Sequence, residues 1–485
     1  MRKNEFLRCL MERDPVDGLL PLSQAQTPDD VRLLGEKGYA IPFTAKEWQE
    51  RYPSIPLEKI YCGKSGILPS VMVYYDKDKY IYLEIMYGDC PMPMTVEGDF
   101  EEVLIRTIKQ AEDAYQRKDY AHLLFSFISE SSGNITMRLI KDMLQNEEPS
   151  GNLYKAIISA YRFIDNAGGG FDLEDIKRLA ACKTPEQVRN TQEKLADMPD
   201  EIVVYRGMGG ASTAHDRSIS WTTKESVAYF FAARRDEVNA MVVTGTVEKQ
   251  AVVEFFDDEE SEILLYPQDV KNLAATTCVP MEEFLKSFSR SPSYLRKKGI
   301  VSIVDHILDN INSVYGKKSE GDHDAEHTKR VALMACYLFL RAYIPYAEGN
   351  RFKEGHIKSM FWTLMNAAAY HDRGRDDDGA DLNHGERGYA IYAQSHPKNA
   401  LVAFLIMGHV VADSAMHSLY RSCKVKDIPY EEAKLLLGIL KDADALDRWR
   451  FSLSSGDFVR VDMLRLPESK RLMAVAAALQ GMGLE

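Results

Sequence analysis

Arginine, serine and glutamate side chains follow one another at the ends of β-type segments between residues 200 and 267. The segment EIVVYRG ends on Arg206 and a glycine, SISWTTKESVAYFFAARR carries Ser220 where a strand passes into a helix, and DDEESEILLYP places Glu260 and Glu262 ahead of a strand. A guanidinium fork suits the oxygens of a diphosphate. A carboxylate can stabilise positive charge that develops on a neighbouring sugar carbon.

Each of these residues also has an ordinary structural interpretation. An arginine at a strand end is usually a surface charge, and a run of acidic residues is usually a solvated loop. Thr222 with Glu225 three residues later fits a helix capping box. Spacing does not separate Glu259 from Glu260 as the first acidic residue of the pair. A functional site is favoured because all three elements occur in one order with suitable strand and helix neighbours.

This layout resembles the arginine–serine–glutamate class of mono-ADP-ribosyltransferases, although Ser-x-Thr replaces the common Ser-x-Ser and the loop before it is short. The resemblance implies that NAD is the substrate and that Glu262 stabilises the ribosyl cation. It implies that Glu260 orients or deprotonates the acceptor, that Arg206 binds the diphosphate and ribose, and that Ser220 braces the glutamate. The implied NAD-binding residues are Arg206, Gly207, Ser220, Thr222, and Tyr229 or Phe230 as an aromatic wall.

Histidines and aspartates recur on the apolar faces of helical segments in the C-terminal part of the chain. His327 shares a helical face with Val331 and Leu338, and Asp444 shares one with Leu440. A single such histidine is more often a hydrogen-bonded core residue. Several buried together are costly unless they share a compensating charge, which a metal ion supplies. The candidate ligands are His327, His371, Asp372, His384, His409 and Asp444.

The order of these ligands resembles the HD-domain metal-dependent phosphohydrolases, most closely in AAYHDRGRDDDGADLNHGERG and DADALDR. The resemblance implies a first ion on His327, His371, Asp372 and Asp444. It implies that Asp372 bridges to a second ion on His384 and His409. Imidazole and carboxylate ligands suit Mn, Fe, Zn, Mg or similar divalent ions.

Several residues near these ligands leave alternatives open. Asp442 competes with Asp444 as a ligand, and the helical phase favours Asp444. His323, His396 and His417 are interpreted as incidental. Four basic residues could bind phosphate or be surface charges: Lys329, Arg373, Arg375 and Arg448.

The elements that must position these residues predict an α+β multidomain chain. Residues 1–95 form an N-terminal α+β domain whose segment VMVYYDKDKYIYLEIMY predicts a hairpin turning at DKDK. Residues 96–287 form the ADP-ribosyltransferase-like domain, with a helical lobe at 96–198 and a β core at 199–287. Within the core, AMVVTGTVEKQAVVEFF predicts a second hairpin. Residues 288–485 form an all-α HD domain.

Composition and charge narrow the class of protein. The 485 residues are long enough for two to four domains, and 45% hydrophobic with 27% charged residues is ordinary for a globular protein. A net charge of −13 argues against broad binding to nucleic acid. The longest apolar run, VALMACYLFL, is too short to cross a bilayer. Seven scattered cysteines indicate reduced thiols. We expect a cytoplasmic protein, with delivery as an effector without a classical signal peptide also compatible.

These observations lead us to expect a bifunctional enzyme. One half transfers ADP-ribose from NAD to a macromolecule, by resemblance an arginine on a protein rather than nucleic acid, and the other hydrolyses a phosphoester or nucleotide. Such a pairing suits a toxin or effector. Two alternatives stay open: the middle domain hydrolyses NAD with water as acceptor, or one domain is an idle nucleotide sensor that regulates the other.

Overall fold

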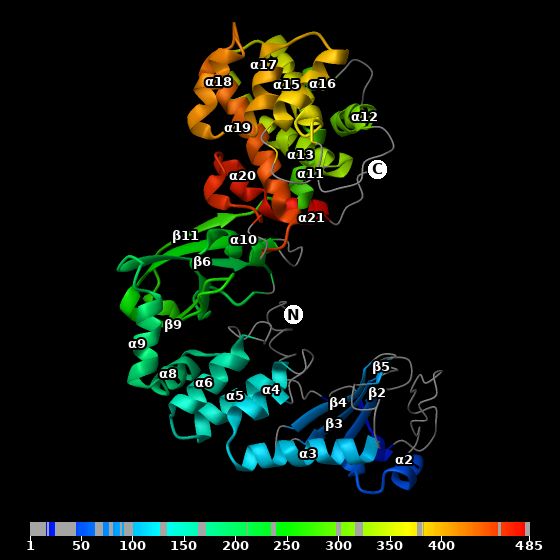
Figure 1. Cartoon of the computed structure of the whole chain (residues 1–485), viewed down its shortest axis with the longest axis vertical. Coiled ribbons are helices and arrows are strands. Elements are labelled where there is room, and N and C mark those ends of the chain that lie inside the picture. The colour runs from blue at the N-terminus through cyan, green and yellow to red at the C-terminus, as the bar shows by residue number, and fades with distance from the viewer. Residues whose placement is uncertain are drawn as a thin grey trace.

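The computed structural model combines two antiparallel sheets with many helices, which confirms the predicted α+β class (Figure 1). The division into domains stays a prediction. The structure describes residues 16, 19–24, 45–63, 71–76, 81–87, 90–91, 100–126, 133–162, 171–210, 212–233, 239–296, 302–315, 324–375, 381, 383–453 and 457–480.

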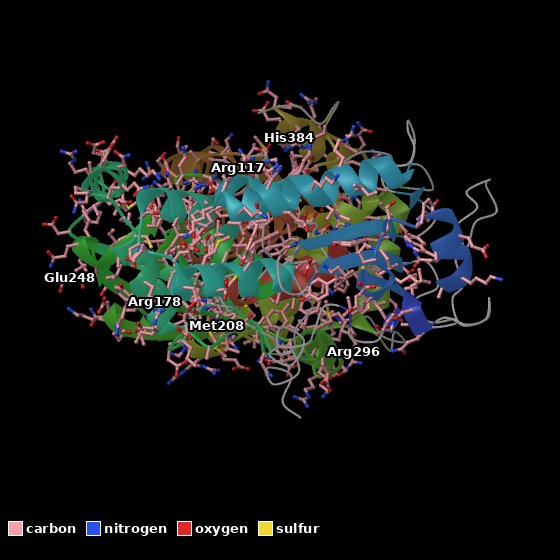
Figure 2. The ribbon with its side chains drawn as sticks, turned by 90° about the horizontal axis from the view of Figure 1, so that it is seen from below. Arg117, Arg178, Met208, Glu248, Arg296 and His384 are labelled. Atoms are coloured by element: carbon pink, nitrogen blue, oxygen red, sulfur yellow. The ribbon has the colours of Figure 1, made fainter. Side chains whose placement is uncertain are left out.

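The N-terminal region contains a five-stranded antiparallel sheet in the order β1-β2-β3-β4-β5. Asp76 pairs with Ile81 across β3 and β4, which confirms the predicted strand pairing, while the turn between them lies outside the described residues. Trp48 of a short helix is fully buried, and α3 runs alongside the sheet (Figure 1 and Figure 2). The elements are β1 Leu19–Pro21, α2 Ala45–Arg51, β2 Ile60–Gly63, β3 Val71–Asp76, β4 Ile81–Tyr87, β5 Cys90–Pro91 and α3 Phe100–Gln116.

A helical layer follows and packs against the second sheet. Its apolar side chains, such as Ile140 and Ile157, share one core with Phe256 and Leu264 of the β core. Two of its helices have capping boxes, at Asp172 and Thr184, which satisfy backbone N–H groups at their first turns. The helices are α4 Tyr120–Ser126, α5 Gly133–Asn146, α6 Gly151–Tyr161, α8 Leu173–Ala181 and α9 Pro185–Lys194.

The second sheet has six strands in the order β11-β8-β6-β7-β10-β9, and every pairing is antiparallel. The predicted hairpin over residues 240–256 is wrong, because β8 pairs with β6 and β11 while β9 lies at the opposite edge beside β10. The elements are β6 Glu201–Met208, β7 Ser220–Thr222, α10 Glu225–Ala233, β8 Met241–Glu248, β9 Val252–Phe255, β10 Glu262–Leu265 and β11 Lys271–Thr277.

In the C-terminal region every described secondary-structure element is a helix, as the sequence predicts, and the apolar run at 331–340 lies in buried helix. Among the residues that the structure describes, none of the helices has the length and hydropathy of a membrane span. The main helices are α11 Met281–Ser289, α12 Ile303–Tyr315, α13 Ala325–Leu338, α14 Ile344–Gly349, α15 Glu354–Tyr370, α16 His384–Ser395, α17 Ala400–Gly408, α18 Met416–Ser422, α19 Tyr430–Asp447, α20 Pro467–Arg471 and α21 Met473–Gln480.

The β core and the C-terminal helices share a continuous apolar core. Helix α10 packs between β6 and α21, with Ala228 and Ala232 buried in this contact, and α21 lies between the sheet and the helical bundle (Figure 1). Lys470 Nζ lies 3.0 Å from Glu225 Oε1, and Val279 N donates to Arg471 O at 2.7 Å. The two regions therefore meet through apolar packing and polar contacts rather than through a linker alone.

Candidate functional site

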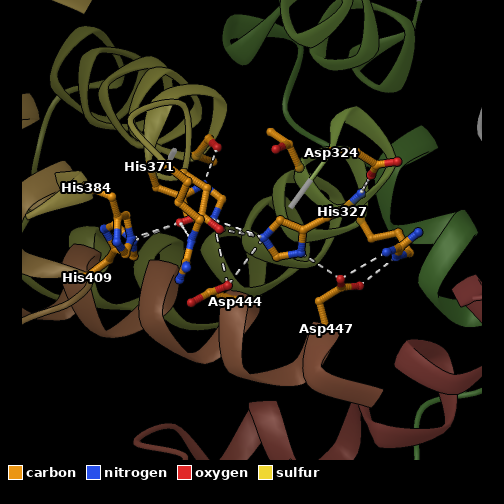
Figure 3. A network of polar contacts seen from close by, with 12 residues as sticks. Asp324, His327, His371, His384, His409, Asp444 and Asp447 are labelled. Atoms are coloured by element: carbon orange, nitrogen blue, oxygen red, sulfur yellow. Dashed lines mark hydrogen bonds and ion pairs between the residues drawn. The ribbon is translucent and has the colours of Figure 1, made fainter. Parts of the chain in front are cut away.

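Four histidines and Asp444 gather in one cluster at the ends of the C-terminal helices (Figure 3). The buried carboxylate of Asp372 belongs to this cluster. Its Oδ2 atom is 3.3 Å from His327 Nε2 and 3.7 Å from His371 Nε2. Asp444 Oδ1 is 3.5 Å and 3.7 Å from the same two nitrogens. Two atoms that each bind one ion at about 2.1 Å lie roughly 3 to 4 Å apart, so these side chains are spaced as one set that could hold an ion.

The other oxygen of Asp372 faces a second pair of histidines. Oδ1 is 3.0 Å from His384 Nε2 and 3.2 Å from His409 Nε2, and these two nitrogens are 2.8 Å apart. Asp372 therefore offers one oxygen to each of two groups of residues, either of which could hold a metal ion. The structure brings together all six ligands that the sequence analysis proposes.

The ends of several helices position this cluster. The Asp324 side chain caps α13 and accepts from His327 N at 2.9 Å, which fixes the first turn that carries this histidine. Gly388 lets α16 approach the end of α15, because a Cβ there would lie 2.7 Å from Tyr370 O. The remaining ligands are His371 and Asp372 at the end of α15, His384 at the start of α16, His409 at the end of α17 and Asp444 in the last turn of α19.

All four imidazoles turn Nδ1 toward an oxygen acceptor and Nε2 toward the centre. The backbone carbonyls among these acceptors can only accept, so the Nδ1 atoms that face them carry hydrogen and a neutral ring presents its Nε2 lone pair to the centre. The contacts are His327 with Asp447 Oδ2 at 2.7 Å, His371 with Ala368 O at 2.8 Å, His409 with Ile406 O at 2.5 Å, and His384 with Asp381 O. This donor set fits a metal ion.

The buried carboxylates of the cluster favour a positive charge on the histidines beside them. Burial alone would lower the pKa of His327, but hydrogen bonds with Asp372 and Asp447 raise it to about 9. Burial opposes ionisation of Asp444, yet the hydrogen bond with His371 holds its pKa well below the usual range. Protons supply the compensating charge in the metal-free protein, and a divalent ion would supply it when bound.

Asp447, the third aspartate of DADALDR, is not among the residues predicted from the sequence. This buried carboxylate accepts from Arg330 Nε at 2.6 Å and Gln480 Nε2 at 3.0 Å, besides its contact with His327. Asp442 instead binds the segment after α19, accepting from Arg465 N at 2.8 Å and Ser469 Oγ at 2.8 Å. Asp444 thus lies at the cluster and Asp442 does not, as the helical phase predicts, while the sequence indicates nothing about Asp447.

Of the basic residues proposed to bind phosphate, Arg375 reaches the cluster. Its Nε atom lies 3.3 Å from Asp372 Oδ1. Lys329 pairs with Glu326 at 2.7 Å, Arg448 pairs with Asp457 at 2.9 Å, and Arg373 lies over the Tyr315 ring. Of the histidines considered incidental, His396 stacks on Tyr392, His417 meets Tyr430 edge to face, and His323 lies outside the described residues.

The structure also brings Arg206, Ser220 and Glu262 together in the β core. Arg206 donates to Ser220 O at 2.6 Å and to Thr213 O at 3.0 Å, and Ser220 Oγ donates to Glu262 Oε1 at 2.5 Å. Ser220 and Glu262 belong to the neighbouring strands β7 and β10, where Glu262 pairs with Thr222. The guanidinium thus holds the segment that leads into β7, and two of its N–H groups are used by backbone carbonyls.

The loop that carries Glu260 is attached to the start of α10. Thr222 Oγ1 donates to Glu260 O at 2.6 Å, and Lys224 Nζ donates to Glu259 O at 3.1 Å. Thr222 also accepts from Lys224 N, so it organises the turn before the helix. Gly207 is required by packing, because a Cβ there would lie 1.8 Å from Ala228 O of α10.

The two aromatic candidates for the nicotinamide wall lie against the C-terminal helices. The Tyr229 side chain is buried in the core shared with those helices. Phe230 stacks on Trp449 and meets Phe458 edge to face, each at 5.8 Å between ring centroids. No hydrogen bond or ring contact within the described part of the chain joins either residue to Glu262.

Tyr161, which the sequence analysis did not select, completes this group. Its hydroxyl donates to Glu262 Oε1 at 2.7 Å from the last residue of α6. Burial raises the pKa of Glu262, although the hydrogen bonds from Ser220 and Tyr161 oppose this increase. Burial lowers the pKa of Arg206 to about 10, which still leaves it charged at neutral pH.

Comparison of the chain with protein-family models, with curated proteins and with solved structures found no match in any of the three.

Proposed function

We propose that the C-terminal helices form a metal-dependent phosphohydrolase with a centre for two divalent ions. The observation that supports this most strongly is the position of Asp372, whose two oxygens face two separate groups of histidines. A purely structural role leaves the buried contact between His384 Nε2 and His409 Nε2 unexplained, because two neutral rings held by Nδ1 would oppose their lone pairs.

His327, His371, Asp372 and Asp444 would hold one ion, and Asp372, His384 and His409 the other. Bound ions of this kind polarise a phosphoryl oxygen and lower the pKa of water. The protein's own groups orient the site: Asp447 holds the ring of His327, and Arg375 supplies positive charge beside Asp372. The Asp444 side chain is 32% exposed while the other ligands are buried, so a substrate would approach on its side.

A phosphoesterase assay with added Mn²⁺, Fe²⁺, Zn²⁺ or Mg²⁺ tests this proposal. We expect the full chain to hydrolyse nitrophenyl phosphoesters or nucleotides only with metal, and a chelator to abolish turnover. Asp372→Asn should remove the activity because it weakens both ligand groups. His417→Gln, on α18, is the matched control and should retain it. Equal activity in Asp372→Asn and the wild type would contradict the proposal.

As a second function we propose that the β core uses NAD to transfer ADP-ribose to a protein. The support is the group formed by Arg206, Ser220 and Glu262: two hydroxyl groups hold the Glu262 carboxylate, and Arg206, bonded to the carbonyl of Ser220, feels the charge of that carboxylate. Such a carboxylate can stabilise the positive charge of a ribosyl cation. Glu260 lies in the loop ahead of Glu262 and would receive the proton of the acceptor.

Incubation with labelled NAD, with and without a cell lysate, tests this second function. Label in protein indicates transfer, and free ADP-ribose without labelled protein indicates hydrolysis. Glu262→Gln should abolish both, since the amide cannot stabilise the cation in the same way. Asp257→Asn, which changes an exposed residue of the same acidic loop, should leave turnover unchanged. No consumption of NAD by the wild type would refute the proposal.

A further inference from the structure

Two hydroxyl groups meet at one oxygen of Glu262. Ser220 Oγ approaches Oε1 at 2.5 Å from β7, and the Tyr161 hydroxyl approaches the same atom at 2.7 Å from the end of α6. The Tyr161 ring is 4% exposed and lies nearly parallel to Phe256 at 5.9 Å, with Phe171 at 5.9 Å on a tilted plane. Packing therefore fixes the hydroxyl in place.

The second oxygen of Glu262 has a different environment. The hydroxyl groups of Ser220 and Tyr161 both donate to Oε1. Within the described residues, no hydrogen bond reaches Oε2. We propose that Tyr161 is a positioning residue, which with Ser220 locks Oε1 so that Oε2 faces the ribose of a bound dinucleotide. This inference rests on the proposed transfer of ADP-ribose.

Two turns before Tyr161, a second tyrosine of α6 also donates its hydroxyl to a glutamate. Tyr154 and Tyr161 are seven residues apart and so lie on one face of the helix. The Tyr154 hydroxyl donates to Glu254 of β9, the strand next to the one that carries Glu262. The helical layer therefore reaches both strands through tyrosine hydroxyls.

The two glutamates differ in what else they bind. Glu254 is buried, and Lys183 lies 3.2 Å from its Oε2 while Lys194 lies 3.3 Å from its Oε1. Thr191 contacts both oxygens as well. Glu254 is thus saturated and structural, whereas Glu262 keeps an oxygen for a ligand.

The hydrogen bond from Tyr161 should affect the pKa of Glu262. The charged and titratable groups that face Glu262 are Arg206, Tyr161, Glu260 and Asp258, besides the hydroxyl of Ser220. A hydroxyl that donates to a carboxylate stabilises the ionised form and lowers its pKa. Removing the Tyr161 hydroxyl therefore raises the pKa of Glu262, while removing the Tyr154 hydroxyl leaves it unchanged.

The experiment compares Tyr161→Phe with Tyr154→Phe in the full chain. The carboxyl of Glu262 is titrated by ¹³C NMR of glutamate-labelled protein, with the resonance assigned by its loss in Glu262→Gln. NAD turnover is measured across the same pH range. We expect Tyr161→Phe to raise the pKa of Glu262, to move the acidic limb of the pH profile upward, and to lower kcat about tenfold with little change in KM.

Tyr154→Phe is the matched control, because it also removes one tyrosine hydroxyl from the same face of α6, but a hydroxyl that binds Glu254 instead of Glu262. It should lower stability without moving the pKa of Glu262 or the pH profile. The inference is overturned if Tyr161→Phe leaves the pKa of Glu262 unchanged, or if both variants move it equally. If the wild type does not consume NAD, the proposed function fails, and the NMR titration still decides whether Tyr161 holds Glu262.

Discussion

Replacing Asp447 by asparagine should weaken metal binding without removing a ligand. Asp447 accepts from His327 Nδ1 at 2.7 Å and from Arg330 Nε at 2.6 Å. An asparagine amide has one acceptor oxygen, which the charged Arg330 would attract. The amide N–H₂ would then face His327 Nδ1 and favour the tautomer with hydrogen on Nε2, the atom that must bind the ion.

The magnitude follows from the role of such outer partners. Loss of the carboxylate that orients a ligating histidine typically lowers metal affinity about 10- to 100-fold, equivalent to about 1.4 to 2.7 kcal/mol. Asp442→Asn is the matched control, because Asp442 is equally buried in α19 but binds Arg465 and Ser469 rather than a histidine. Both variants should lose stability, and only Asp447→Asn should lose affinity.

Competition with a chelator, followed by metal analysis of the recovered protein, measures the two dissociation constants. Circular dichroism and thermal unfolding establish that each variant is folded at the temperature of the assay. An Asp447→Asn protein that is folded and binds metal within about twofold of the wild type would refute the assigned role of this carboxylate.

Three further predictions concern proton competition, NAD chemistry and packing. Because the raised pKa of His327, about 9, keeps the ring doubly protonated in the metal-free protein at neutral pH, metal must displace a proton. Apparent affinity should then rise about tenfold per pH unit up to about pH 9, and titration calorimetry showing no rise would contradict this. Glu262→Gln should abolish NAD consumption, measured by release of nicotinamide, while Asp257→Asn retains it. Gly207→Ala should lower the free energy of unfolding by about 1 to 3 kcal/mol, because its Cβ would meet Ala228 O; unchanged denaturant unfolding would disprove the close contact.

The sequence predicted which face of a helix is buried better than it predicted which strands pair with each other. Helical phase set Asp444 rather than Asp442 toward the cluster, because burial depends on a period of 3.6 residues that the sequence displays. The β-type pattern of residues 240–256 predicted two strands, which β8 and β9 confirm, but it predicted the wrong neighbours for them. Each strand of a hairpin pattern can pair elsewhere, and here the two edges of β8 are occupied by β6 and β11.

The supporting residues could not be read from local sequence. Tyr161 meets Glu262 across 101 residues, and His327 meets Asp447 across 120. The sequence around Tyr161 or Asp447 has no local pattern that marks either residue as a partner of a site residue. Only the packing of α6 on the sheet, and of α13 against α19, brings these groups to their partners.

Metal content of the purified chain tests the central claim most directly, since the proposed hydrolase depends on two ions bridged by Asp372. The protein is loaded with Mn²⁺ or Fe²⁺, freed of excess, and analysed by mass spectrometry and by anomalous diffraction. We predict two ions per chain at roughly 3.5 to 4 Å from each other, one on each side of the Asp372 carboxylate. A folded chain that retains no ion, or that binds ions away from these histidines, would contradict this account.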